Sequence, residues 1–108
     1  MTNDERKALE RQIIRKLIRM MKEAGWAVFQ VDDGGEERVK VTTEGEAMDA
    51  IFAVDDSQLI LKKDNTRHVV CIVLGNSHDV ITDYSFNESD NFEATMDAHS
   101  AYVDALQD

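Results

Sequence analysis

Apolar side chains near the start of the chain recur at a spacing typical of an α-helix. The repeat consists of Leu9, Ile13, Ile14, Leu17, Ile18, Met20 and Met21. So broad a stripe predicts a helix over residues 4–24 that covers a hydrophobic core. Thr2 and Glu5 have the spacing of a capping box, in which both side chains accept hydrogen bonds from backbone amides. Gly25 predicts the end of the helix, because glycine readily adopts the left-handed conformation found there.

Alternation of apolar and polar residues predicts a first β-hairpin. Residues 26–32 alternate, with Ala27, Phe29 and Val31 pointing to one side of the strand, and residues 39–42 alternate in the same way. The connecting motif DDGG, residues 32–35, is a typical turn sequence. We therefore expect a hairpin with one buried face and one largely wet face.

A second hairpin is predicted from residues 58–63 and 67–74, joined by a turn over residues 64–66. Residues 69–74 are apolar throughout, which is typical of a central strand covered on both faces. Cys71 lies in this run and is interpreted as a small buried hydrophobic residue rather than a reactive thiol. The lone cysteine, the polar first residues and the lack of a long apolar run favour a cytoplasmic protein.

Two shorter segments have helical spacing. Residues 44–53 follow Thr43, whose partner in a second capping box is Glu46. Residues 89–106 place Phe92, Met96 and His99 on one face, so we expect His99 to be a packing residue rather than a ligand. Residues 79–85 fit either a short strand or an irregular crossing.

These elements follow the order α-β-β-α-β-β-α, and no linker or repeat divides the chain. The sequence therefore predicts one α+β domain over residues 1–108, with N- and C-terminal helices packed on a mainly antiparallel four-stranded sheet. The apolar stripe of the first helix is wider than one small sheet covers. This width predicts a homodimer formed through the N-terminal helix.

Charge is distributed unevenly along the chain. Lys and Arg number 12 and Asp and Glu number 22, so the formal net charge is -10. Residues 1–22 contain seven basic residues and three acids, whereas eight acids and no Lys or Arg follow Arg67. A strongly negative surface favours binding to a basic partner and disfavours polyanions.

Four acids of the last predicted helix fall near one face: Asp90, Glu93, Asp97 and Asp104. One interpretation is a solvated face that keeps the protein soluble. The other is a docking surface for a basic protein, including a nucleic-acid-binding protein that would meet carboxylates in place of phosphates. The partner-binding hypothesis places the contact on these four residues.

A basic row on the first helix supports an alternative function. It comprises Arg11, Arg15, Arg19 and Lys22. Such a row is able to contact the phosphates of a nucleic acid. It is equally explained by packing against acidic segments of the same chain, and no aromatic residues alternate with it as single-strand binding requires.

A third hypothesis is a small ligand-binding or enzymatic domain around His78, Asp79, Asp83 and Tyr84. No spacing matches a metal or cofactor motif, so no cofactor or metal is expected. The adjacent Ser77-His78-Asp79 has the residue types of a catalytic triad, but triads are assembled from distant positions. The sequence therefore favours a protein that is not an enzyme.

Three segments resemble small uncharacterised proteins of phage and prophage genomes: AIFAVDD at residues 50–56, VLGN at 73–76 and DVITDY at 79–84. The similarity covers residues 47–84 and brings no catalytic residues. It implies a phage accessory protein that binds a host protein, including components of antiviral defence.

Overall fold

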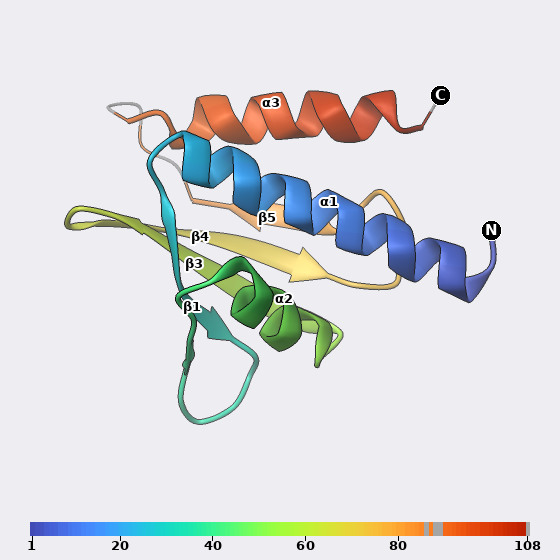
Figure 1. The fold of residues 1–108 in the computed structure, drawn as a ribbon, viewed down its shortest axis with the longest axis horizontal. Coiled ribbons are helices and arrows are strands. Elements are labelled where there is room, and N and C mark those ends of the chain that lie inside the picture. Colours follow the sequence, from blue (N-terminus) through green and yellow to red (C-terminus); the bar gives the residue numbers. More distant parts are fainter. Residues whose placement is uncertain (86, 88–89, 108) are drawn as a thin grey trace.

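The computed structural model describes residues 1–85, 87 and 90–107 (Figure 1). In chain order its elements are α1 (Asn3–Glu23), β1 (Ala27–Asp32), β2 (Val39–Lys40), α2 (Glu44–Phe52), β3 (Asp56–Lys63), β4 (Thr66–Val73), β5 (Ile81–Tyr84) and α3 (Phe92–Ala105). The predicted α+β class, both hairpins and all three helices are confirmed. Residues 88–89, which include the predicted start of the last helix, lie outside the described residues.

The strands form one antiparallel sheet in the order β2-β1-β3-β4-β5. The predicted four-stranded sheet is wrong, because the ambiguous residues 79–85 contain a fifth strand. In β5, Asp83 pairs with Cys71 and Ile81 pairs with Ile72, so Thr82 is an extra residue that forms a bulge. A short bulged strand has almost no two-residue period, which explains why the pattern left it ambiguous.

A second bulge corrects the predicted alternation in β1. Val28 pairs with Leu61 and Gln30 pairs with Ile60, so Phe29 is the extra residue. Val28 and Val31 therefore face the same side, although strict alternation places them on opposite sides. The bulge allows both valines to contact the core.

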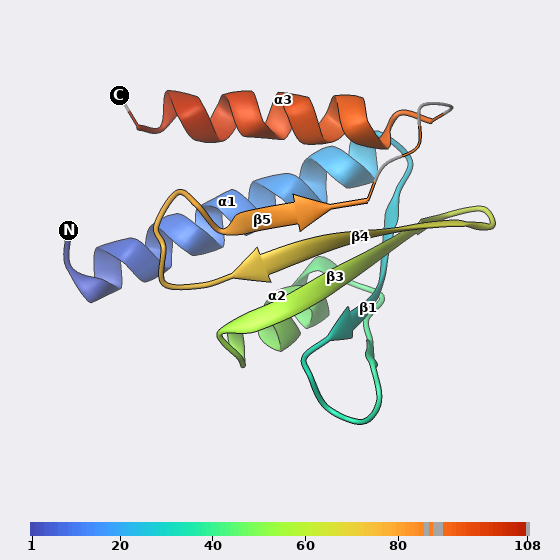
Figure 2. The same cartoon turned by 180° about the vertical axis from the view of Figure 1, so that it is seen from behind.

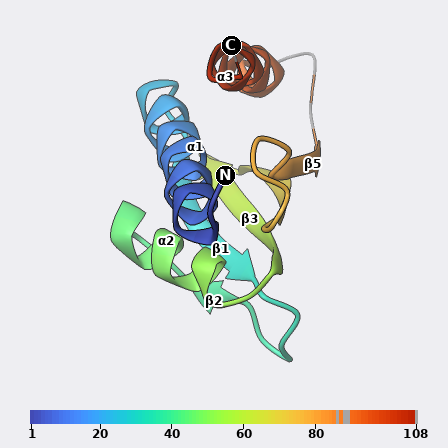
Figure 3. The same cartoon turned by 90° about the vertical axis from the view of Figure 1, so that its right-hand side faces the viewer.

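One face of the sheet is not covered by a helix (Figure 3). Every second side chain of β4 faces the helices and is buried: His68, Val70 and Ile72. The intervening side chains are only partly buried, so the prediction of a strand covered on both faces is wrong. Cys71 is one of them and is partly exposed rather than buried. Ile60 on this open face is buried nonetheless, beside its cross-strand neighbour Val69.

The helix boundaries follow the predicted capping residues closely. The Thr2 Oγ1 accepts the Glu5 amide at 3.1 Å, and the Glu5 carboxylate accepts the Thr2 amide in return. Gly25, at φ +95°, follows the last turn of α1. Thr43 caps α2 by accepting the Glu46 amide, but the Glu46 carboxylate accepts the amide of Thr42 rather than that of Thr43, so the predicted second capping box is only half formed. Among the described residues, no helix has the length and apolarity that a membrane crossing requires.

The apolar stripe of α1 is mostly covered within the chain. Five of its residues are buried in the core: Ile13, Ile14, Leu17, Ile18 and Met21. Both α2 and α3 pack on α1 in addition to the sheet, while Leu9 and Met20 of the stripe stay partly exposed. Most of the stripe that motivated a homodimer is therefore covered within the chain.

A buried carboxylate joins α1 to the loop between β4 and β5. Glu10 is 1% exposed, and its Oε2 accepts the backbone amides of Gly75 at 2.8 Å and Ser77 at 3.0 Å. The other oxygen, Oε1, accepts the Arg6 guanidinium at 2.6 Å. Both loop residues have positive φ, +106° and +58°, and this conformation directs their amides toward one anion.

The substitution Glu10→Ala is expected to lower the free energy of unfolding by about 2 kcal/mol or more, because two amides lose their acceptor at a buried site. The control Glu23→Ala removes an exposed carboxylate from the same helix and is expected to change stability by less than about 0.5 kcal/mol. Urea denaturation of the three proteins measures both values. Equal stability of the two variants would contradict the proposed role of Glu10.

Candidate functional site

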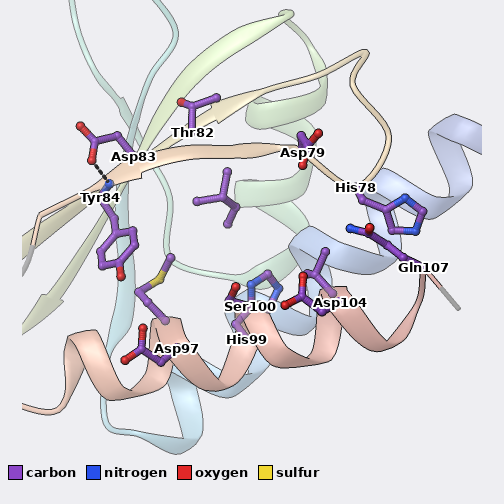
Figure 4. A pocket seen from close by; sticks show the side chains of 13 residues that line it. His78, Asp79, Thr82, Asp83, Tyr84, Asp97, His99, Ser100, Asp104 and Gln107 are labelled. Atoms are coloured by element: carbon purple, nitrogen blue, oxygen red, sulfur yellow. Dashed lines mark hydrogen bonds between the residues drawn. The ribbon is translucent and has the colours of Figure 1, made fainter.

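A cavity of about 290 Å³ lies between β5 and α3 (Figure 4). The loop before β5, β5 itself and one side of α3 form its walls. We call this cavity the β5–α3 groove. All four residues of the predicted ligand-binding set line it: His78, Asp79, Asp83 and Tyr84. The structure therefore provides the concave site that this hypothesis requires.

Four aspartates line the groove, Asp79 and Asp83 on the β5 side and Asp97 and Asp104 on α3. The Asp83 carboxylate points away from α3 in Figure 4, because Asp83 pairs with Cys71, whose side chain lies on the open face of the sheet. The acidic row and the ligand-binding set, predicted as separate sites, thus meet in one groove. No Lys or Arg is among the residues that line it. No group of described residues gathers three potential metal ligands, so the four carboxylates are spread along the groove rather than converging on one point.

The negative charge in the groove acts on Tyr84. Partial burial raises the pKa of the Tyr84 phenol, and the nearby carboxylates of Asp97, Glu93 and Asp83 raise it further. A phenolate would add another negative charge to this cluster. Tyr84 therefore keeps its proton, and its hydroxyl remains a donor and an acceptor.

The groove exists because α3 rests on α1 rather than on β5. The His99 Nε2 lies 2.9 Å from the Ile13 carbonyl oxygen, and the Gln12 amide donates to the Tyr102 hydroxyl at 2.9 Å. The Lys16 ammonium lies over the Tyr102 ring. These contacts hold α3 on α1 at the edge of the sheet, where it overhangs β5 (Figure 2).

His99 was predicted to be a packing residue, and it is 2% exposed. Its partner, the Ile13 carbonyl, can only accept, so Nε2 carries the proton. Burial lowers the pKa of His99, although the hydrogen bond to Ile13 opposes this effect, and the neutral ring prevails near pH 7. Nδ1 is then an acceptor on a residue that lines the groove.

A second buried histidine clamps the end of β5 to the start of α3. His68 is 3% exposed, with its Nδ1 3.0 Å from the Ser85 Oγ and its Nε2 2.9 Å from the Asp90 Oδ2. The ring stacks on Phe92 and meets the edge of Trp26. The hydrogen bond from His68, followed by the Phe92 amide, lowers the pKa of Asp90.

Hydrogen bonds link a serine, a histidine and an aspartate (Ser85, His68 and Asp90) in the same succession as in a catalytic triad. The Ser85 Oγ accepts the Val69 amide at 2.9 Å, which leaves its own proton for the His68 Nδ1 and makes Nε2 the donor to Asp90. A serine nucleophile needs a substrate cavity beside it. Ser85 is not among the residues that line the β5–α3 groove. We therefore interpret this network as a structural clamp.

The predicted partner-binding row is divided by the structure. Asp97 and Asp104 line the groove, and Glu93 lies near enough to affect Tyr84. Asp90 precedes α3, is 18% exposed and is held by His68, so it is not a free contact residue. Sequence reasoning missed Ser100, which lies between Asp97 and Asp104 on the same side of α3. The spacing of these three residues would have identified it, since positions three and four apart share a helix face.

The predicted nucleic-acid row is largely occupied by contacts within the chain. Arg19 donates to both carboxylate oxygens of Glu44, at 2.8 and 3.3 Å, and Arg15 lies 3.8 Å from the same group. The Arg11 guanidinium lies 4.5 Å from the centre of the Phe52 ring. Only Lys22 has none of these contacts to α2. The packing interpretation therefore explains most of the row.

Comparison of the chain with protein-family models, curated proteins and solved structures found no match. Function is therefore inferred from the geometry of the chain itself.

The pH dependence of stability tests the neutral state of His99. Because its pKa is lowered in the folded protein, the unfolded chain binds a proton that the folded protein excludes. Above pH 6.5, the ordinary pKa of histidine, the neutral His99 should contribute its full stabilisation. The free energy of unfolding should then fall as the pH drops below this value. The variant His99→Gln keeps a donor for Ile13 and should lose this part of the dependence. Urea denaturation from about pH 8 to about pH 5 measures the difference, and parallel curves would contradict it.

Proposed function

We propose that the chain binds a basic segment of another protein in the β5–α3 groove, and that it acts by binding rather than by catalysis. The observation that carries this proposal is that Asp79, Asp83, Asp97 and Asp104 all line one groove, with no Lys or Arg among its lining residues. A lysine or arginine side chain entering the groove would meet the carboxylates of Asp97 and Asp104 on α3. The apolar parts of Ile81, Met96 and Val103 would cover its methylene stem.

Electrostatics favours such a partner before contact is made. Residues 68–108, which contain the groove, carry eight acids and no Lys or Arg to offset them. A negatively lined cleft attracts a cationic partner and raises the association rate, more strongly at low salt. It also repels acidic proteins, which contributes specificity.

The resemblance to phage and prophage proteins suggests where this partner comes from. A phage accessory protein acts in the cytoplasm of a bacterial host, so the basic segment would belong to a host protein. A component of antiviral defence fits this description. A host protein that binds nucleic acid fits especially well, because its phosphate-binding side chains would meet the carboxylates of the groove.

The nucleic-acid alternative has less support. Arg15 and Arg19 both contact the Glu44 carboxylate, which offsets part of their charge, and the acidic groove would repel a polyanion. A mobility-shift assay at low salt separates the two functions, because phosphate binding by the basic row would give a shift that weakens steeply with salt. The ligand-binding alternative involves the same groove and would appear as binding of a small cation without selection for a peptide.

A selection from short random peptides tests the proposed function directly. We expect the chain to enrich peptides rich in Lys and Arg. The double variant Asp97→Lys/Asp104→Lys should weaken their binding at least about tenfold in fluorescence polarisation, mainly through a slower association rate.

The matched control is Glu23→Lys/Asp49→Lys. It changes the net charge by the same amount at two exposed positions outside the groove. Binding should change far less in this control. Equal losses of affinity in the two double variants would show that only net charge matters and would contradict binding in the groove. Failure to enrich basic peptides would contradict the proposed function itself.

A further inference from the structure

β5 forms an edge of the sheet, and its outer side has no strand partner among the described residues. It pairs only with β4, and the order of the strands ends with it. In Figures 1 and 2, α3 runs beyond β5 on the side away from β4. The β5–α3 groove therefore borders the free edge of a strand, where backbone donors and acceptors are available for pairing.

The hydrogen bonds of β5 identify the amide that points to this free edge. The Ser85 amide donates to the Val69 carbonyl of β4. In an antiparallel strand, successive residues direct their amides to opposite sides. The amide of Tyr84 therefore points away from β4, and its carbonyl points the same way.

The Tyr84 amide already has a hydrogen-bond acceptor, which is a side chain of its own strand. The Asp83 Oδ1 accepts it at 2.9 Å, as the dashed line in Figure 4 shows. A carboxylate bound to the amide of the next residue satisfies an edge donor without a second strand. It also keeps the edge from pairing indiscriminately with other strands.

We propose that the basic segment binds in extended form and adds a strand to β5. This inference rests on the proposed function and specifies its binding mode. A carbonyl of the segment replaces Asp83 as the acceptor of the Tyr84 amide, and an amide of the segment donates to the Tyr84 carbonyl. The released Asp83 carboxylate is then available to pair with a Lys or Arg of the segment.

The carboxylates of α3 explain why a segment added beside β5 should carry Lys and Arg side chains. Side chains of an extended segment alternate, so every second one would face α3. Asp97 and Asp104 are seven residues apart on one side of the helix, a rise of about 10 Å. Two alternate positions of a strand are about 7 Å apart, and the long stems of Lys and Arg cover the difference. Backbone pairing then supplies affinity, while alternate basic side chains supply selectivity.

Backbone methylation of a selected peptide tests the added strand. Methylating one amide at a time removes a single donor and leaves the side chains and charges unchanged. We expect affinity to fall at least about tenfold at alternate positions, where the amides face β5, and to change by less than about threefold at the positions between them. This alternation is its own control, because neighbouring peptides differ only in the position of one methyl group.

Hydrogen exchange of the unmodified complex provides an independent measurement. The Tyr84 amide should exchange at least about tenfold more slowly in the complex, because a backbone carbonyl replaces the exposed side-chain cap. Uniform effects of methylation, or an unchanged Tyr84 exchange rate, would overturn the added strand while leaving the acidic groove in place. Failure to select any basic peptide would instead overturn the proposed function.

Discussion

The hydrogen bond between His99 and the Ile13 carbonyl determines where α3 lies. Ile13 lies inside α1. A carbonyl oxygen has two lone pairs, so the Ile13 carbonyl is able to accept a hydrogen bond from the His99 ring in addition to its bond within the helix. The bond forms only with Nε2 protonated, and burial keeps the ring neutral. A third helix anchored in this way packs on α1 at the margin of the sheet. The contacts of Gln12 and Lys16 with Tyr102 hold α3 in the same position, which leaves the groove between α3 and β5.

The two halves of the chain use their charges differently. In the N-terminal half, Arg15 and Arg19 on α1 both contact Glu44 on α2, so part of the positive charge of α1 is offset. In the C-terminal half, aspartates from the β5 side and from α3 line one groove, with no basic residue among its lining residues. Such mutual repulsion disfavours the compact state unless other contacts outweigh it. The buried rings of His68, Phe92 and Trp26 pack against one another where α3 begins and provide such contacts.

Local patterns predicted much of the fold, because much of it is encoded locally. The stripe on α1, the Thr2 cap and the turn at Gly25 each involve residues within a few positions of one another. The bulges at Phe29 and Thr82 interrupt the two-residue period, so strand faces and β5 itself were not predictable in this way. The groove joins residues 79–84 to residues 97–104, and no periodicity connects them. The pairing of His68 with Asp90 is likewise a tertiary contact that only folding reveals.

The carboxylate of Glu10 also limits how this chain is able to diverge. It is the shared acceptor of Arg6, Gly75 and Ser77, which come from the first helix and from a turn far along the chain. A change in the backbone of that turn would leave the buried carboxylate without its amide donors. Loss of the carboxylate would leave the amides of the turn without their acceptor. Among descendants of this sequence, these four positions should vary as a set or not at all. Their exposed neighbours Lys7 and Asn76 have no such contacts and are free to drift.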